Sequence, residues 1–211
     1  MTDLLKIIEL LKKEYHNSKL TLDFKNPLEL LIATMLAAQY KDVLVNKITE
    51  ILFKKYKTAD DFAKTNFKEL LSYIKSATFA ATKAKNIIST CKVLVEKYNG
   101  KVPKTMEELT SLPGVGRKTA NVVLSNAYGI IVGIEVDRHI ARVSYRLGLT
   151  KNLEPIKIEE DLMRTIPKNE WLKFSHIVKD HGRAVCKNPI PFCSKCFLDK
   201  LCPKNGVTKH Y

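Results

Sequence analysis

Residues Leu112–Ala120 read LPGVGRKTA and join two segments of helical periodicity through a turn with two glycines. Gly114 and Gly116 can adopt positive φ angles and let the backbone approach an anion closely. Backbone amides around Val115 and Gly116, at the start of the second segment, would then point at a phosphate. A G-x-G pair alone is weak evidence, because many corners between helices need two glycines only for the turn. On a basic chain, the stretch predicts a hairpin between helices that binds the DNA backbone.

The chain of 211 residues is strongly basic. It has 36 Lys and Arg residues against 22 Asp and Glu, which gives a formal net charge of +14. A compact body this basic attracts polyanions and releases counterions from a nucleic-acid backbone. Genome composition or solubility would produce the same charge, so composition alone leaves both interpretations open. Because thirty of the cations are lysines, which bind backbones but read bases poorly, we expect little sequence specificity.

Helical periodicity runs through almost the whole chain. Apolar residues recur at helical spacing near the N-terminus, and Asn26-Pro27, Asp42 and Asp137 supply start signals for later helices. Only Gly129–Val136 resembles a strand, and it is short. About 25 residues at the C-terminus lose this periodicity and gain Cys, Pro and Lys. We therefore predict an all-α fold with an irregular C-terminal module.

Composition excludes several classes of protein. Apolar residues make up 45% of the chain, enough to offset the entropy of ordering, so intrinsic disorder is excluded. No uncharged stretch is long and apolar enough to span a bilayer. The N-terminal segment has acidic residues inside an amphipathic repeat and lacks a cleavage site, which predicts a helix and not a signal peptide. We expect an intracellular protein, cytoplasmic and associated with the nucleoid if its source is a prokaryote.

Four cysteines form a C-x6-C-x2-C-x5-C run in the C-terminal module: Cys186, Cys193, Cys196 and Cys202. The module is too short and irregular to bury a core of its own, so another interaction must hold it together. Disulfides do not suit an intracellular chain. Four thiolates can hold a tetrahedral zinc ion or a cubane [4Fe–4S] cluster, and the spacing alone leaves both open. The fifth cysteine, Cys91, falls on an apolar helix face and is expected in the core.

Lys118 and Asp137 are the candidate catalytic residues, although each also has a plain structural interpretation. Lys118 falls in the first turn of a helix, where a cation opposes the helix dipole, and Arg117 is a like-charged neighbour. Both effects favour a neutral amine, which is a nucleophile. The structural interpretation is an ordinary solvated or phosphate-binding lysine. Asp137 is first of all the expected N-cap of the next helix, and a carboxylate there can also serve chemistry.

Three motif blocks, in this order along the chain, resemble the endonuclease III family of helix-hairpin-helix DNA glycosylases. They are LPGVGRKTANVVL from Leu112, VDxHIxRV at Val136–Val143, and HGRxxC from His181, which leads into the run of four cysteines. The resemblance extends from about residue 20 to Cys202. The combination of the three blocks is highly specific.

The resemblance implies an all-α fold of two lobes with DNA bound across the cleft between them. Residues 20–130 would form a helical barrel that contains the helix-hairpin-helix, and residues 1–19 plus 131–211 would form the second lobe, the iron–sulfur cluster domain. The four cysteines would hold a [4Fe–4S] cluster, which replaces zinc as the expected metal cofactor. The cluster would mainly shape a lysine-rich loop against the DNA phosphates.

The resemblance also implies base excision repair of oxidised or otherwise damaged pyrimidines. Lys118 matches the family's nucleophile, and Asp137 matches its catalytic aspartate. The damaged pyrimidine is flipped out of the stack, and Lys118 attacks the sugar C1′ and expels the base. β-Elimination from the resulting Schiff base, the AP lyase step, then cuts the strand 3′ to the lesion. Asp137 would stabilise the cationic sugar or deprotonate the amine.

Further residues would contact DNA. Gln39 matches a glutamine that fills the gap left by the flipped base, and Phe79 stands where the family usually has a leucine wedge. The segment around Phe79, Thr78–Thr82, departs from a more polar family segment, so the resemblance does not fix the lesion preference. His139 matches a position near the cleft and also has a structural interpretation as a backbone contact. We expect DNA contacts from Gln39, Phe79, Gly114, Val115, Gly116, Arg117 and His139.

Two other functions stay open. One is a mismatch glycosylase for uracil or thymine opposite guanine, or for adenine, which Lys118 in the nucleophile position and the lack of an extra C-terminal recognition domain disfavour. The other is a non-catalytic iron–sulfur protein that binds DNA for scanning or redox sensing, which would need neither Lys118 nor Asp137. The expected partner is double-stranded DNA with damaged bases or abasic sites. We expect a monomer with no membrane association.

Overall fold

The computed structural model describes residues 2–211, and all regular secondary structure in this range is helical. This confirms the predicted all-α class. The strand candidate Gly129–Val136 contains no strand. Throughout residues 2–211, no helix combines the length and the apolar character needed to cross a membrane.

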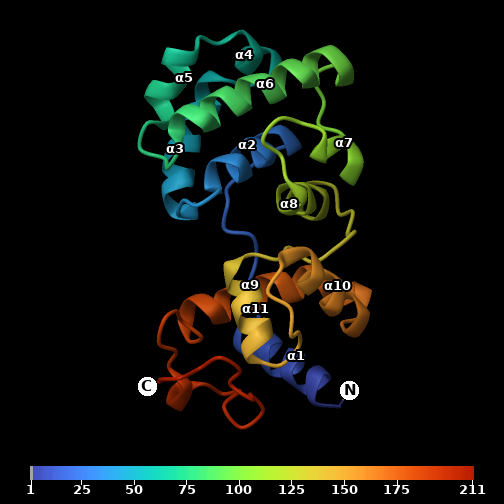
Figure 1. The fold of residues 1–211 in the computed structure, drawn as a ribbon. Helices are drawn as coiled ribbons and strands as arrows, with labels where there is room; N and C mark the ends of the chain where they lie inside the picture. Colours follow the sequence, from blue (N-terminus) through green and yellow to red (C-terminus); the bar gives the residue numbers. More distant parts are fainter. Residues whose placement is uncertain (1) are drawn as a thin grey trace. The chain divides into compact units, whose positions relative to one another are not determined.

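The chain folds into two compact units (Figure 1). One is the continuous segment Thr21–Val132, and the other joins the N-terminal residues up to Leu20 to the segment Gly133–Tyr211. We refer to them as the central unit and the terminal unit. The barrel and cluster domains assigned to residues 20–130 and to 1–19 plus 131–211 stay predictions.

The central unit is built around α2 (Pro27–Ala37), which is buried over most of its length and packs against α3, α6 and α8. Asn26 caps α2 as predicted, because its side chain accepts a hydrogen bond from the Glu29 amide at 2.9 Å. The other helices of this unit are α3 (Asp42–Lys55), α4 (Ala59–Lys64), α5 (Phe67–Ile74), α6 (Ala80–Tyr98), α7 (Met106–Thr110) and α8 (Arg117–Ala127).

The predicted N-cap role of Asp42 is wrong. Lys41 occupies the N-cap position of α3 in extended conformation, and Asp42 is the first helical residue. The Asp42 carboxylate instead accepts a hydrogen bond from the Thr21 hydroxyl. This contact ties the start of the central unit to α3, and a long-range partner therefore displaces the local capping bond.

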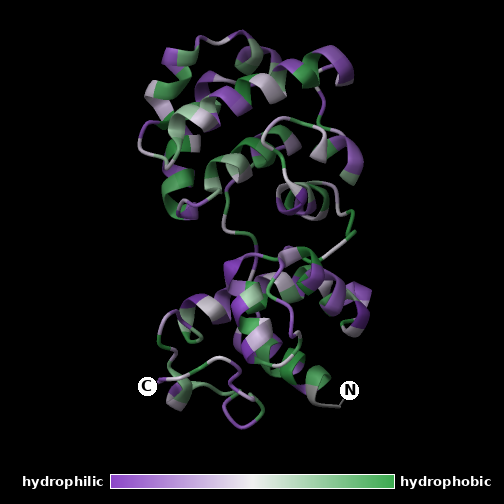
Figure 2. Cartoon of the chain, in the orientation of Figure 1, coloured by the Kyte–Doolittle hydropathy of each residue, from purple (hydrophilic) through white to green (hydrophobic). Residues whose placement is uncertain are grey.

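The terminal unit packs α11 (Trp171–Ala184) against both the N-terminal helix α1 (Thr2–Glu14) and α9 (Arg138–Arg146). The apolar face of α1 is buried, and its polar side forms an ion pair between Lys12 and Glu170 at 2.9 Å. Figure 2 shows polar and apolar residues side by side on most helices, as expected for amphipathic helices around a core. The unit also contains α10 (Pro155–Thr165) and the 3-10 turns η1 (Lys168–Glu170) and η2 (Cys193–Lys195).

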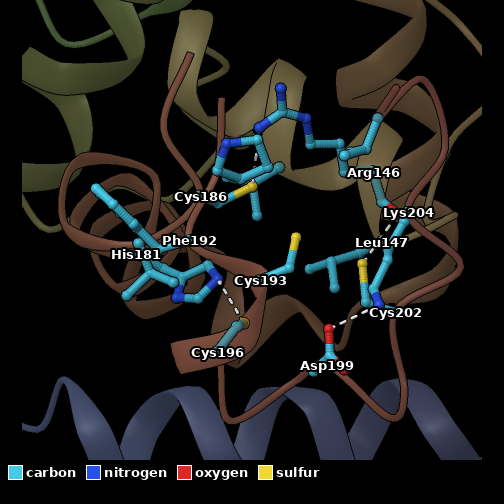
Figure 3. A pocket seen from close by; sticks show the side chains of 14 residues that line it. Arg146, Leu147, His181, Cys186, Phe192, Cys193, Cys196, Asp199, Cys202 and Lys204 are labelled. Carbon is cyan, nitrogen blue, oxygen red and sulfur yellow. Dashed lines mark hydrogen bonds and ion pairs between the residues drawn. The ribbon is translucent and has the colours of Figure 1, made fainter. Parts of the chain in front are cut away.

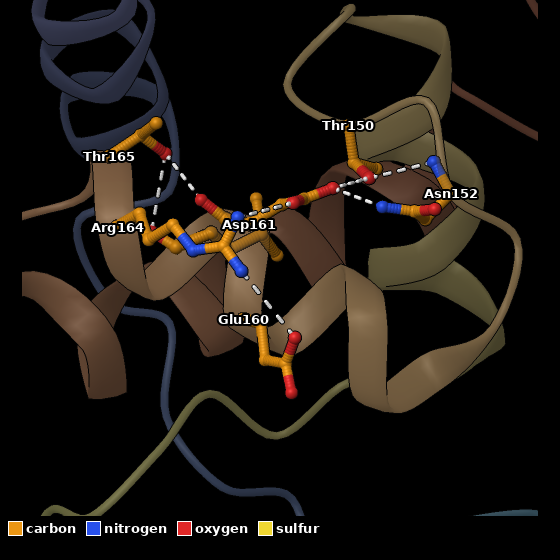
Figure 4. A network of polar contacts seen from close by, with 7 residues as sticks. Thr150, Asn152, Glu160, Asp161, Arg164 and Thr165 are labelled. Carbon is orange, nitrogen blue, oxygen red and sulfur yellow. Dashed lines mark hydrogen bonds and ion pairs between the residues drawn. The ribbon is translucent and has the colours of Figure 1, made fainter.

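A polar network on α10 fixes the loop that connects it to α9 (Figure 4). Asp161 Oδ2 accepts hydrogen bonds from Thr150 Oγ1 at 2.6 Å and from Asn152 Nδ2 at 2.7 Å. The other carboxylate oxygen lies 3.6 Å from the guanidinium of Arg164. The hydrogen bonds from Thr150 and Asn152 lower the pKa of Asp161, so the network stabilises the fold at neutral pH and loses strength as the carboxylate is protonated in acid.

Gly182 allows α9 and α11 to approach each other closely. A Cβ atom at this position would lie 3.0 Å from the Cβ of His139 and 3.2 Å from Cγ2 of Val143. Arg142 of α9 also donates a hydrogen bond to the Gly182 carbonyl at 2.9 Å. The close contact between α9 and α11 therefore leaves little room for a side chain at 182.

We expect Gly182→Ala to lower the free energy of unfolding by about 1–3 kcal/mol, because the added methyl group overpacks the α9–α11 contact. Helix propensity alone predicts the opposite sign, since alanine stabilises a helix interior by about 1 kcal/mol relative to glycine. Urea unfolding followed by circular dichroism measures the difference. A variant as stable as the wild type or more stable would show that the two helices separate without cost.

Candidate functional site

The hairpin predicted at Leu112–Ala120 connects α7 to α8 and packs on α6. Gly114 has a φ of +75°, and a Cβ atom there would lie 2.5 Å from Asn86 Nδ2 of α6. Thr90, one turn further along α6, donates a hydrogen bond to the Pro113 carbonyl at 2.6 Å. Glycine at 114 is therefore required by both the backbone conformation and the close contact. The predicted positive φ of Gly116 is wrong, because its φ is −94°.

The N-terminus of α8 is the part of the hairpin that can bind an anion. Gly116 occupies the N-cap position, and no side chain caps the first turn. The Val115 amide, by contrast, donates to the Leu112 carbonyl at 3.1 Å, and the Val115 side chain is buried. The expectation that the Val115 amide points at a phosphate is therefore wrong. The uncapped amides of α8, with the positive end of the helix dipole, remain suited to a phosphate.

Lys118 and Arg117 are the first two residues of α8, and both side chains are exposed. Lys118 is therefore within reach of any group bound at this helix N-terminus. An amine in this position can bind a phosphate or, when neutral, attack an electrophilic carbon.

Gln39 and Phe79 lie at the tips of two loops of the central unit. Both adopt left-handed backbone conformations, with φ angles of 54° and 55°, and both side chains are exposed. Gln39 follows the C-terminus of α2, and Phe79 is the N-cap residue of α6. Thr78 Oγ1 donates a hydrogen bond to the Gln39 carbonyl at 2.8 Å and so joins the two tips.

A cavity of about 230 Å³ lies between these tips and the hairpin. Apolar side chains and the polar groups of α6 share its wall. Its volume exceeds the roughly 150 Å³ in which an engineered protein cavity accommodates benzene, so a planar ring fits by size. The lining residues are Met35, Ala38, Gln39, Phe79, Thr82, Lys83, Asn86 and Gly114.

Asp137 caps α9, as its position before the helix predicts. Its Oδ1 atom accepts hydrogen bonds from the amides of His139 at 2.7 Å and Ile140 at 2.9 Å. Oδ2 takes no part in this cap, and the side chain is half-buried. The two oxygens allow a single carboxylate to hold the helix start and present a negative charge to a ligand.

The His139 ring is held by its own helix. Arg142 NH2 lies 3.1 Å from Nδ1, and since guanidinium only donates, Nδ1 is the acceptor and Nε2 carries the proton of the neutral ring. Burial lowers the pKa of His139 and outweighs the attraction of Asp137. The backbone of His139 makes the contact to Asp137, and the contact of its ring with DNA stays a prediction.

The four cysteines of the C-terminal module line one cavity in the terminal unit (Figure 3). None of them forms a disulfide. Apolar side chains from α9 and the module, among them Val143, Leu147 and Val207, complete the wall. Across residues 2–211, no three His, Cys, Asp or Glu side chains converge closely enough to hold a single metal ion.

The chemistry of this donor set fits a metal group bound by thiolates. Burial raises the pKa of Cys193 and Cys202 and raises that of Cys196 to about 11, and neighbouring cysteines add to each shift. Four thiolates in this cavity would therefore repel one another unless a metal group neutralised them. The sulfur atoms and the apolar wall suit a soft, thiophilic metal.

Two side chains outside the cysteine motif hold the cysteine loop in place. Arg146 of α9 is buried and donates to Cys186 Sγ at 3.4 Å and to the Lys187 carbonyl at 2.7 Å. His181 of α11 places Nε2 3.7 Å from Cys196 Sγ (Figure 3). The sequence motif does not reveal either contact. The only available signal is the i, i+4 spacing of Arg142 and Arg146, which places both on one face of α9.

Comparison with known proteins agrees with this geometry. Residues 32–168 match the family described as HhH-GPD superfamily base excision DNA repair protein. An endonuclease III from Synechocystis sp. is 49% identical over 197 residues, which cover 93% of this chain and 90% of the relative. The chain belongs to the endonuclease III family. The resemblance recognised in the sequence is therefore confirmed.

Solved structures of endonuclease III extend this similarity to three dimensions. One is a non-covalent endonuclease III–DNA complex, and another is a trapped covalent endonuclease III–DNA intermediate with an estranged adenine. Each matches with a TM-score of 0.92 and 42% identity, over 96% of this chain and 95% of the solved chain.

In this endonuclease III family member, the candidate residues fall into separate groups. The central unit brings together Gln39, Phe79 and the hairpin, and the terminal unit brings together the four cysteines. Lys118 lies in the central unit and Asp137 in the terminal unit, so their joint action stays a prediction. Lys83 cannot be recognised from the sequence, because a lysine in a helix is normally expected in solvent.

The cap gives Asp137 a structural role that substitution can separate from its charge. We expect Asp137→Ala to lower the free energy of unfolding by about 1 kcal/mol, because two amides of α9 lose their acceptor. Asp137→Asn keeps an oxygen in the same place and should change stability by less than about 0.5 kcal/mol. Urea unfolding of the three proteins tests this. Equal losses for both variants would mean that the charge, and not the cap, supplies the stability.

Proposed function

We propose that this endonuclease III family member is a bifunctional DNA glycosylase and AP lyase of base excision repair that removes damaged pyrimidines. The observation that carries the proposal is the placement of Lys118, an exposed amine in the first turn of α8 directly after the hairpin. The relative trapped as a covalent DNA intermediate supports a mechanism with a covalent step. A glycosylase that used only water as nucleophile would not need an amine at this position.

DNA binding draws on charge and on the hairpin. The net charge of +14 provides a sequence-independent attraction to the phosphate backbone. The uncapped N-terminus of α8 and Arg117 hold a phosphate at the hairpin, and Gly116, where a Cβ atom would meet nothing within 4 Å, leaves the backbone open to close approach. Such contacts set the position of the enzyme on DNA without reading its sequence.

Gln39 and Phe79 serve the flipping of the damaged nucleotide. An extruded base leaves a gap in the stack, and the Gln39 amide can fill it with hydrogen bonds to the partner base. Phe79, whose side chain is 65% exposed, provides an apolar surface that can stack against that base. Flipping costs least where damage has already weakened stacking or pairing, which gives the enzyme part of its selectivity.

Lys118 carries the covalent chemistry. The neutral amine attacks C1′, and the bond between C1′ and the base breaks with its electron pair leaving on the base. Opening of the sugar ring gives a protonated Schiff base between Lys118 and C1′. This cation acidifies the proton on C2′, and its removal expels the 3′ phosphate by β-elimination. The nitrogen donates its electron pair in the first step and withdraws electrons as the protonated Schiff base in the second, which water does not do.

Asp137 supplies a negative charge beside the positive charge that develops during these reaction steps. Its carboxylate stabilises positive charge on the sugar, or accepts a proton from the attacking amine. The α9 cap fixes Oδ1, so Oδ2 is the oxygen available for this role. His139, on the same helix turn, would contact the DNA backbone.

The four cysteines, Cys186, Cys193, Cys196 and Cys202, would hold a [4Fe–4S] cluster. When bound, it supplies a cross-link between distant points of the C-terminal module, and it takes no part in the steps above. Arg146 and His181 already contact two of the sulfur atoms. Exposed lysines on this module, Lys187, Lys195 and Lys200, would then face DNA phosphates. An enzyme that acts on damaged chromosomal DNA would work at the nucleoid of a prokaryotic cell.

Borohydride reduction tests the Schiff base directly. We expect wild-type protein to form a covalent adduct with duplexes that contain one abasic site or one thymine glycol, and Lys118→Ala to form none, because borohydride reduces only an imine carbon to a stable amine. Denaturing electrophoresis measures the adduct. Lys85→Ala removes a similarly exposed lysine and serves as the matched control. Base release without any adduct would place the protein among monofunctional glycosylases, and DNA binding without chemistry would favour the scanning role.

Loss of one cluster ligand tests the cofactor. We expect Cys193→Ser to lose the visible absorbance of iron–sulfur together with solubility, because the module has little core of its own and depends on the metal for folding. Cys91→Ala removes the buried thiol of α6 and should keep the full absorbance. Iron and sulfide analysis of the purified proteins measures the number of iron and sulfide ions bound per protein molecule. A Cys193→Ser protein without iron that stays folded and DNA-bound would contradict the structural role of the cluster.

A further inference from the structure

The buried side chain of Lys83 is the least expected feature of the central unit. It is only 7% exposed, and its ammonium donates hydrogen bonds to the carbonyl oxygens of Leu36 at 2.6 Å and Ala38 at 2.8 Å. The centre of the Tyr40 ring, on the loop that follows α2, lies 5.7 Å from Lys83 Nζ. Within the described chain, its partners are carbonyl groups and a ring, with no carboxylate. Burial lowers the pKa of Lys83, because the charged form loses hydration without gaining a counterion.

These contacts place a positive charge at the C-terminus of α2. The last carbonyl groups of a helix have no partner inside it and carry the negative end of its dipole. Lys83 satisfies two of them just where the chain turns sharply into Gln39, whose φ is 54°. A left-handed conformation is unfavourable for glutamine and persists only where its surroundings hold it.

Two residues of one short segment, Thr78 and Lys83, bind the backbone of the loop that carries Gln39. Lys83 Nζ binds the Ala38 carbonyl before Gln39, and Thr78 Oγ1 binds the Gln39 carbonyl itself at 2.8 Å. The backbone amide of Lys83 donates to the Phe79 carbonyl at 3.0 Å in the first turn of α6. The Lys83 side chain therefore ties the Gln39 loop to the helix turn that begins at Phe79.

We infer that Lys83 is a positioning residue for nucleotide flipping, which fixes the Gln39 and Phe79 tips as one preorganised unit before DNA binds. This rests on the proposed function and on the roles given there to the two tips. An apolar side chain would fill the same site without the cost of burying a charge. A lysine there lowers the entropy cost of ordering the tips when they enter the duplex.

The test compares two substrates that differ in what must be unstacked. A duplex with thymine glycol requires extrusion of a base, whereas a duplex with an abasic site has no base to unstack. We expect Lys83→Met to lower single-turnover excision of thymine glycol about tenfold or more at saturating enzyme, since misplaced groups cost rate in proportion to lost orientation. Borohydride trapping on the abasic duplex should stay within about threefold of wild type. Lys85→Met, which removes an exposed lysine of the same helix, should match wild type on both substrates.

Three further measurements separate positioning from a general structural role. Thr78→Val changes an exposed side chain and removes the second contact to Gln39, so it should reproduce the same split between substrates. In a Gln39→Ala background, Lys83→Met should have little further effect, because residues that act through each other are not additive. Fluorescence of 2-aminopurine opposite the lesion should rise on binding of wild type and rise less for Lys83→Met.

The outcomes are distinct. Equal loss on both substrates, or full additivity with Gln39→Ala, would overturn the inference and leave Lys83 a structural residue while the proposed function stands. Activity of Lys83→Met equal to wild type on thymine glycol would do the same. Wild-type protein without activity on either substrate would overturn the proposed function, and the inference with it.

Discussion

The contact between Asn86 of α6 and Gly114 of the hairpin is the constraint on which the central unit depends. Gly114 leaves no room for a side chain, so the hairpin takes its position directly from α6. Lys83, Asn86 and Thr90 follow one another at helical spacing on one face of α6. Lys83 and Thr90 donate hydrogen bonds to the carbonyl groups of Ala38 and Pro113, and Asn86 packs where a side chain at Gly114 would lie. A single helix, α6, thereby sets the separation between the Gln39 loop and the hairpin.

Helix ends supply almost every side chain to which the proposed chemistry assigns a role. Lys118 begins α8, Asp137 precedes α9, Phe79 precedes α6, and Gln39 follows α2. Unpaired backbone groups and an abrupt change of chain direction occur together at these ends. They give a side chain exposure while the helix behind it remains rigid. The helices thus fix the positions of these residues, and the helix termini leave their side chains accessible to a ligand.

Local signals in the sequence predicted much of this arrangement. The caps at Asn26 and Asp137 and the turn at Gly114 depend on neighbouring residues alone, so they could be recognised without a structure. Asp42 failed as a cap because Thr21, distant in sequence, binds its carboxylate. Lys83 and Arg146 went unrecognised for the same reason, since carbonyl groups and a sulfur atom far along the chain hold them. The sequence does not show which distant groups a charged side chain binds.

The arrangement of the two units along the chain also orders events during synthesis on the ribosome. The central unit is one continuous segment, so all its contacts become available once Val132 has emerged. The α1 helix is made before the central unit, yet its packing partner α11 is made after it. An amphipathic helix with an unpaired apolar face must therefore wait through the translation of the whole central unit. During that interval the nascent chain exposes Ile7, Ile8 and Leu11, which are buried in the folded protein.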